Sequence, residues 1–201
     1  MTAEPATIAT RDPAAVPLIC FVGRSGSGKT TLLEGLIATL SRRGLRVGVV
    51  KHHAHDVELD VPKKDSWRLA KAGATATAVS GPSQFALIRR VAEEPTLAEL
   101  VELMPEADIV LTEGFKAQVE TCVEVLRSER SSEPVCDVSQ LIALVTGVPT
   151  DCLPTTYAAA VAAGTLRRFD LNDVEAIAQA VVSGTLSCRA QDKNARSSTT
   201  P

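Results

Sequence analysis

The sequence predicts an α/β fold, a mostly parallel sheet with helices on both faces, and two observations carry that prediction. Short continuous apolar runs at 17–22, 46–51, 107–114 and 141–147 are typical of strands buried on both faces of a sheet. They alternate with amphipathic segments, and parallel strands require such crossover helices. Ligands of these sheets bind beyond the carboxyl ends of the strands. The loops that follow Val22, Val50 and Thr112 are therefore the expected functional loops.

The other elements follow from periodicity and from capping signals. Thr96 and Glu99 form a capping box, and Asn172 and Glu175 are expected to cap a later helix. Residues 122–128 predict an edge strand. The remaining expected elements are helices at 30–44, 65–74, 97–104 and 173–182 and strands at 75–80 and 85–91.

Composition indicates one soluble globular domain at 17–184, between a disordered leader at 1–16 and a disordered tail at 185–201. Of the 201 residues, 45% are hydrophobic and 22% charged, which suits a buried core. The five scattered cysteines form no C-x-x-C pair, so they favour neither a zinc ribbon nor a disulfide framework. A net charge of −3 with 3% aromatic residues argues against a nucleic-acid surface. The sequence shows no secretory signal and no membrane-spanning run, so we expect a cytoplasmic protein.

The segment GRSGSGKT, from Gly23 to Thr30, matches the phosphate-binding pattern G-x-x-x-x-G-K-[ST] between a predicted strand and helix. Its glycines let backbone N–H groups converge on one anion, toward which the helix aims its positive end. Lys29 adds charge for the β and γ phosphates, and the Thr30 hydroxyl is placed to ligate Mg²⁺. A three-layer P-loop NTPase fold is predicted. The expected nucleotide-binding residues are Gly23, Ser25, Gly26, Ser27, Gly28, Lys29, Thr30, Thr31, Lys51 and His52.

Phosphoryl chemistry also needs a carboxylate that orders the metal or its water shell. The segment DIVLTEG offers Asp108 and Glu113. Asp108 opens the predicted strand and Glu113 closes it, roughly 16 Å further along at the ligand-bearing edge. Glu113 is therefore the predicted metal residue, and the alternative is an ordinary exposed loop carboxylate.

The loop at 52–65 holds all three histidines of the chain, His52, His53 and His55, beside several carboxylates. One interpretation is a zinc or nickel site. Another is a switch loop in which Lys51 and the histidines approach phosphates while Asp60 or Asp56 orders Mg²⁺ or a water. A third is a solvated loop without function. We favour the switch loop, with Asp60 as its metal residue, because the second strand places this loop beside the glycine loop.

A helix with a single tryptophan, Trp67, follows that loop. We expect Trp67 to lie in a core or in a contact between two copies of the chain. Arg68 and Lys71 on the same helix either reach a ligand or are solvated.

Three segments together, GRSGSGKTTLL, VKHHAHDVELDVPKKDSWRLAKAGA and DIVLTEGFK, resemble the molybdopterin-guanine dinucleotide biosynthesis B protein (MobB) family, and the likeness runs from about residue 18 to 182. The resemblance implies a homodimer that binds GTP with Mg²⁺ and hydrolyses it feebly. It also implies a partner, the MobA-like molybdopterin guanylyltransferase, and molybdopterin intermediates as further ligands. By position, Gly23 to Thr31 would be the phosphate loop, Lys51 to Asp60 the switch-like loop and Glu113 the strand-end acid.

This chain departs from the family pattern at two positions. Lys63 stands where relatives usually have glycine, and Gly147 stands where we expect an acidic residue that reads guanine. The leading hypothesis is a GTP-binding accessory protein with no dedicated catalytic residue. The alternatives are a nickel or zinc metallochaperone GTPase that uses His52, His53 and His55, and a small-molecule kinase. A kinase would need a lid with paired arginines, and none stands out in the sequence. A metallochaperone would be expected to have a cysteine ligand near the histidines, and this chain has none there.

Overall fold

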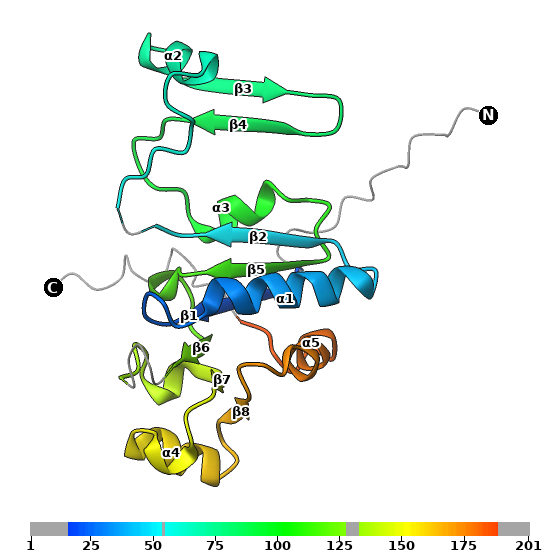
Figure 1. The fold of residues 1–201 in the computed structure, drawn as a ribbon, viewed down its shortest axis with the longest axis vertical. Coiled ribbons are helices and arrows are strands. Elements are labelled where there is room, and N and C mark those ends of the chain that lie inside the picture. Colours follow the sequence, from blue (N-terminus) through cyan, green and yellow to red (C-terminus); the bar gives the residue numbers. More distant parts are fainter. Residues whose placement is uncertain (1–15, 54, 128–132, 189–201) are drawn as a thin grey trace, which may run out of the picture. The chain divides into compact units, whose positions relative to one another are not determined.

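A computed structural model describes residues 16–53, 55–127 and 133–188 (Figure 1). The chain forms two compact units: the first contains the residues up to 52 and from 96 onward, and the second contains residues 53–95. The domain predicted at 17–184 spans both. Most of the predicted leader lies outside the described residues, and its last residue, Val16, packs against the core.

The first unit contains a six-stranded sheet with the order β2-β5-β1-β6-β7-β8. Every neighbouring pair is parallel, which confirms the predicted α/β fold. β1 lies in the interior of the sheet and all its residues are buried, as its unbroken apolar sequence requires. The strands are β1 (Leu18–Val22), β2 (Val47–Lys51), β5 (Ile109–Glu113), β6 (Cys122–Leu126), β7 (Leu141–Thr146) and β8 (Arg167–Phe169).

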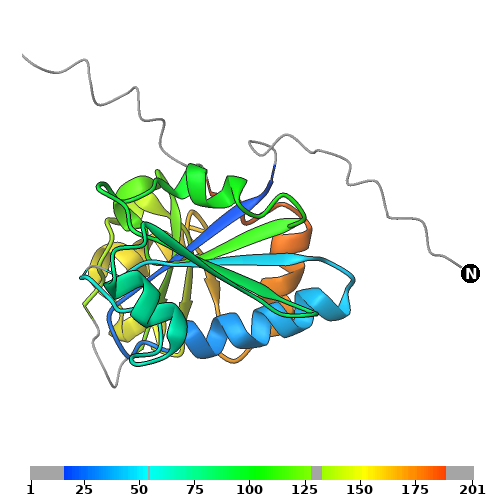
Figure 2. The same ribbon diagram turned by 90° about the horizontal axis from the view of Figure 1, so that it is seen from above.

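Helices cover both faces of this sheet. Figure 2 shows α1 (Lys29–Arg42) and α3 (Leu97–Glu102) on opposite sides of the strands. The other helices are α4 (Thr155–Ala162) and α5 (Val174–Val182), with 3-10 turns η2 (Lys116–Gln118), η3 (Val138–Gln140) and η4 (Thr150–Cys152). α1 packs on α5 at Gly35, where a Cβ atom would lie 3.3 Å from a methyl group of Val174. Among the described residues, no helix combines the length and the apolar character that crossing a bilayer requires.

The second unit consists of α2 (Asp65–Lys71) and an antiparallel pair of strands, β3 (Ala76–Ser80) and β4 (Phe85–Arg89), with α2 packed on β3 (Figure 1). This confirms the predicted helix and the two strands. The capping box at Thr96 and Glu99 is also confirmed.

Several expectations about the second half of the chain are wrong. β6 is an interior strand that pairs with β1 and β7, whereas we expected an edge strand. β7 is followed by a further parallel strand, β8. Asp173 caps α5 by accepting a hydrogen bond from the Ala176 amide, in place of Asn172 and Glu175. Leu186 and Cys188 are buried, so the packed chain continues past Gly184 into the predicted tail.

Candidate nucleotide-binding site

The carboxyl ends of β1, β2 and β5 meet at one edge of the sheet. Glu113, the last residue of β5, lies opposite Phe21 of β1 and Lys51 of β2 in the strand register. The glycine loop that follows β1 and the segment that follows β2 therefore start beside Glu113. Asp108 lies at the other end of the strand, where its carboxylate pairs with Arg46 at 2.9 Å. The sequence argument that preferred Glu113 over Asp108 matches this geometry.

The glycine loop offers backbone N–H groups to an anion. Gly28 precedes α1 with φ of 94°, and Gly26 also has positive φ. The described residues provide no hydrogen-bond acceptor for the amides of Gly28, Lys29 and Thr30. Three unpaired donors at the positive end of a helix form the arrangement that binds phosphate.

The remaining residues of the loop shape this cradle. Ser25 and Gly26 are exposed, as is Thr31 in the first turn of α1. Ser27 is buried, and its hydroxyl has no partner among the described residues. Its burial fits a structural place under the loop, while the exposed residues would border a phosphate bound there.

The Lys29 ammonium turns back onto the loop, where it donates to the carbonyl oxygens of Gly23 and Arg24, each at 2.9 Å. Burial lowers the pKa of Lys29, and the charge of Lys51 lowers it further, while Glu113 opposes the shift. A partly buried cation that only neutral carbonyls contact lacks a full counter-charge. A phosphate in the cradle would supply that charge.

Glu113 joins the other two polar groups of the site. Its carboxylate accepts a hydrogen bond from the Thr30 hydroxyl at 3.0 Å, and Lys51 Nζ lies 3.4 Å from the same oxygen. The Glu113 side chain is 15% exposed, so it reaches the surface only at this edge. A hydroxyl and a carboxylate oxygen this close are the donor types that Mg²⁺ prefers.

His52 packs onto the segment that follows Glu113. Its amide donates to the Glu113 carbonyl at 2.9 Å, and its ring lies 4.8 Å from the ring of Phe115, measured between centroids. Gly114 has φ of 100°, and a Cβ atom there would lie 2.9 Å from the Cβ of His52. Glycine is therefore required between Glu113 and Phe115.

The other residues of the predicted switch loop belong to the second unit. His53 and His55 are exposed, and Asp60 Oδ1 accepts from the Val61 amide at 2.7 Å and the Ser66 hydroxyl at 3.0 Å. Across the part of the chain that the structure describes, no three His, Cys, Asp or Glu side chains gather into a metal site. The metallochaperone alternative therefore finds no support, and the metal role of Asp60 stays a prediction.

Comparison with known proteins agrees with this geometry. The sequence model of a family described as molybdopterin guanine dinucleotide synthesis protein B, MobB, matches residues 18–147. The chain belongs to the MobB family. The molybdopterin-guanine dinucleotide biosynthesis adapter protein of Escherichia coli (strain K12) is 37% identical over 174 residues, which cover 83% of this chain and 92% of that protein. The adapter protein of the same name from Haemophilus influenzae is 34% identical, over 67% of this chain and 76% of the relative.

Solved MobB structures share the fold. The crystal structure of Bacillus subtilis MobB has a TM-score of 0.66 and 30% identity, over 85% of this chain and 98% of that chain. A crystal structure of molybdopterin-guanine biosynthesis protein B has a TM-score of 0.62 and 31% identity, over 83% and 98% of the two chains. The resemblance that the sequence motifs indicated is confirmed.

The two positions that depart from the MobB pattern have structural consequences. Lys63 has φ of 73°, a left-handed conformation that glycine adopts at lower cost. The turn at Lys63 is thus the one a glycine would make, with an added cation. At Gly147, which follows β7, no heavy atom lies within 4 Å of the position a Cβ atom would take. An acidic side chain would fit there, so steric crowding does not explain why this MobB chain has glycine at position 147.

One residue beside the loop was missed by the sequence analysis. A Cβ atom on Gly28 would lie 3.9 Å from a guanidinium nitrogen of Arg127, which directly follows β6. The misplacement of β6 at the sheet edge hid this proximity. Because β6 pairs with β1 in parallel, the carboxyl end of β6 lies beside the glycine loop that follows β1.

Proposed function

We propose that this protein binds GTP with Mg²⁺ and acts as an adapter for the MobA-like transferase that attaches a guanine nucleotide to molybdopterin. The observation that carries the proposal is the cradle of three unpaired amides at Gly28, Lys29 and Thr30. The adapter role is supported by the names of the relatives. The proposed nucleotide contacts are those expected from the sequence, from Gly23 to Thr31 with Lys51 and His52.

The metal ion would bind at Thr30 and Glu113, whose oxygens lie 3.0 Å apart. The residues present fit Mg²⁺, since both offer hard oxygen donors at the edge where the phosphates would lie. Mg²⁺ would neutralise charge on the terminal phosphates. Glu113 is already engaged by Thr30 and Lys51, which suits an acid that orders a metal better than a base that activates water. We therefore expect only slow hydrolysis.

We also propose that the working form is a homodimer. Phe85 and Leu87 alternate along β4 and are 78% and 59% exposed, so they present apolar side chains on one face of the two-stranded sheet. α2 packs on β3 and leaves these two side chains of β4 exposed. A second copy of the chain would cover this face. Sedimentation of the parent protein and of Leu87→Glu tests this: a dimer that persists in the variant contradicts the proposed interface.

The cytoplasm is the compartment that we propose for this function. Cys122 and Cys136 lie buried with their sulfur atoms 3.3 Å apart and both are free thiols. The described cysteines form no disulfide, as is usual for proteins of a reducing compartment.

Calorimetric titration of GTP and ATP, with and without Mg²⁺, tests nucleotide binding. We expect Lys29→Ala to weaken GTP binding about 100-fold, since a charge-assisted contact to phosphate contributes about 1.5–3 kcal/mol. Lys64→Ala, which removes an equal charge before α2, is the matched control and should bind as the parent does. Equal affinity of the parent and Lys29→Ala proteins would refute the proposed site.

The adapter role needs a separate experiment. The purified protein, loaded with GTP, is mixed with a molybdopterin guanylyltransferase and analysed by co-sedimentation. We expect a complex and a faster guanylyl transfer by the partner. A transferase whose rate and sedimentation are unaffected would leave nucleotide binding intact as a conclusion and contradict the adapter role.

A further inference from the structure

Two buried thiols lie against each other at the start of β6. Cys122 is the first residue of β6, and Cys136 follows 14 positions later, with the two sulfur atoms 3.3 Å apart. Both are free thiols. The sulfur atoms of a disulfide lie about 2.05 Å apart, so an approach of about 1.3 Å would bring these two to bonding distance. Neither sulfur belongs to the nucleotide site.

The backbone on both sides of the pair is held by other contacts. The Cys136 carbonyl accepts a hydrogen bond from the Tyr157 hydroxyl at 2.8 Å, and the amide of the preceding Val135 donates to the Glu124 carboxylate at 2.6 Å. Cys122 is held by β6, which pairs with β1 and β7. Because the backbone is fixed, the sulfur atoms can approach by side-chain rotation alone. The native fold therefore sets this pairing of thiols.

The two thiols differ in reactivity. The hydrogen bond with Cys122 lowers the pKa of Cys136, and the charge of Lys116 lowers it further, while burial and the charge of Glu124 oppose the shift. The same hydrogen bond, together with burial, raises the pKa of Cys122. Cys136 is 8% exposed and precedes the exposed Asp137, whereas Cys122 is 2% exposed. Since the thiolate is the reactive form of cysteine, Cys136 is the thiol that an oxidant meets first.

We propose that Cys122 and Cys136 form a reversible disulfide, in which Cys136 reacts first with a peroxide and Cys122 resolves the product. With hydrogen peroxide, the Cys136 thiolate attacks one oxygen and the O–O bond breaks, which gives a sulfenic acid and a hydroxide that takes up the thiol proton as water. The Cys122 sulfur then attacks the Cys136 sulfur, and the sulfenic oxygen leaves with the Cys122 proton as a second water. The two thiols lose two electrons, and the peroxide accepts them.

Resolution by Cys122 would keep the oxidation reversible. An unresolved sulfenic acid reacts with further peroxide to a sulfinic acid, which ordinary thiols do not reduce. A sulfinate at Cys136 would place a second anion beside the buried Glu124, in a segment whose Glu133 pairs with Arg24 of the glycine loop at 2.9 Å. A disulfide adds no charge there, and the thiols of a reducing compartment can reduce it.

The test uses the full chain with Cys152→Ser, because the exposed Cys152 could link two copies of the chain. The protein is treated with hydrogen peroxide at neutral pH, the remaining thiols are alkylated after unfolding, and the peptides are analysed by mass spectrometry. We expect the loss of two of the four remaining thiols, a peptide that links Cys122 to Cys136, and recovery of both thiols with dithiothreitol. Cys20, whose pKa burial raises to about 12, should stay reduced.

Single variants test the order of the two steps. In Cys122→Ala, peroxide should convert Cys136 to a sulfinic acid that dithiothreitol does not reverse. In Cys136→Ala, Cys122 should stay reduced under the same treatment, because its pKa is raised and it is less exposed. A Cys122 that is oxidised as readily as Cys136 would contradict the assigned order.

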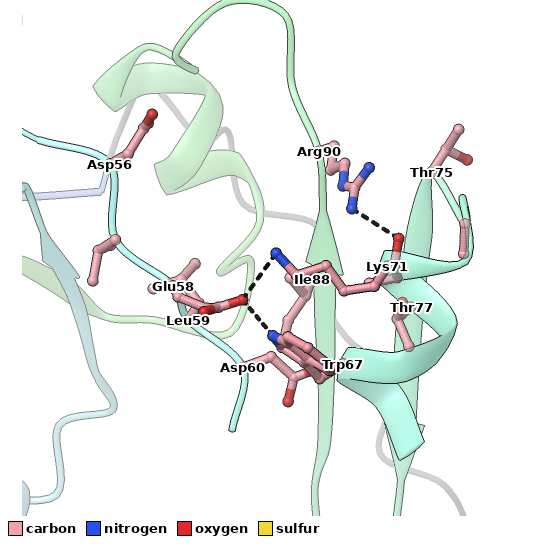
Figure 3. A pocket seen from close by; sticks show the side chains of 13 residues that line it. Asp56, Glu58, Leu59, Asp60, Trp67, Lys71, Thr75, Thr77, Ile88 and Arg90 are labelled. Carbon is pink, nitrogen blue, oxygen red and sulfur yellow. Dashed lines mark hydrogen bonds and ion pairs between the residues drawn. The ribbon is translucent and has the colours of Figure 1, made fainter. Parts of the chain in front are cut away.

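Urea unfolding of the oxidised and reduced forms of the Cys152→Ser protein tests whether the fold accommodates the link. We expect the oxidised form to unfold at the higher urea concentration, because the disulfide constrains the unfolded chain. Trp67 is the control for damage elsewhere. Its indole N–H donates to Glu58, which also pairs with Lys71, in the second unit, whose sequence has no cysteine (Figure 3). Trp67 emission without urea should be the same in both forms.

Any of three results would overturn the proposal. The first is that Cys122 and Cys136 both stay reduced at a peroxide concentration that oxidises the exposed Cys152 of the parent protein. The second is a sulfinic acid at Cys136, or a link from it to another cysteine, while Cys122 is present. The third is an oxidised form that unfolds at a lower urea concentration or changes its Trp67 emission, which would mean that the link distorts the fold.

Discussion

Thr30 donates a hydrogen bond of 3.0 Å to the carboxylate of Glu113, a residue 83 positions further along the chain. The sheet enforces this contact, because β1 and β5 are paired in parallel and the loop after β1 begins opposite the end of β5. A metal that inserted between the two oxygens would connect the first turn of α1 to the interior of the sheet. The contact is therefore the place where metal and nucleotide binding would be coupled.

Replacing Glu113 by Gln tests that coupling. We expect the variant to lose most of the Mg²⁺-dependent part of GTP affinity, about tenfold or more, because an amide is a weaker Mg²⁺ ligand than a carboxylate. Affinity without Mg²⁺ should change little, since the amide cradle is untouched. Calorimetry in both conditions measures this. Asp108→Asn, at the opposite end of the same strand, is the control, and an equal Mg²⁺ effect in the parent and Glu113→Gln proteins would contradict the metal role.

The first residue of the glycine loop is constrained by its neighbours. Gly23 has φ of 145°, and a Cβ atom would lie 2.3 Å from the Val125 carbonyl oxygen. We expect Gly23→Ala to lower the free energy of unfolding by more than about 2 kcal/mol, since backbone of both strands must move. Gly164→Ala, where φ is 71° with nothing within 4 Å, should lose only about 1 kcal/mol. Urea unfolding compares them, and equal losses would show that the contact with Val125 does not matter.

The sequence was sufficient to predict the parts of the site that depend on local pattern. The glycine loop is contiguous, and the place of Glu113 follows from counting along one strand. The error at β6 has a different origin, because a charged residue such as Glu124 in the middle of CVEVL is typical of a strand with a solvated face. In the structure Glu124 is fully buried, and the Val135 amide and the Tyr157 hydroxyl donate to its carboxylate at 2.6 and 2.9 Å. Those partners come from later segments, so no local pattern could reveal them.

Tyr157→Phe removes one of these partners. The hydroxyl of Tyr157 also contacts the Cys136 carbonyl at 2.8 Å, and burial raises its pKa well above the usual range. We expect the variant to lose about 1.5–3 kcal/mol of unfolding free energy, because a buried carboxylate loses a donor. Adding Glu124→Gln to Tyr157→Phe should recover part of the loss in urea unfolding. Additive losses in the double variant would contradict a direct coupling of the two side chains.

Arg127 provides the prediction that the sequence alone did not suggest. Its guanidinium lies beside Gly28 at the start of α1, where the phosphates of a bound nucleotide would lie. We expect Arg127→Ala to weaken GTP binding about tenfold, because each charge-assisted contact contributes about 1.5–3 kcal/mol. If the guanidinium contacts the terminal phosphate, GDP binding should weaken less than GTP binding. Arg127→Lys should recover only part of the affinity, since an ammonium cannot form two parallel hydrogen bonds. Arg167→Ala, an exposed arginine of β8, is the matched control. If titration at low and high salt gives the same GTP affinity for the Arg127→Ala and Arg167→Ala proteins, Arg127 lies near the phosphates without contacting them.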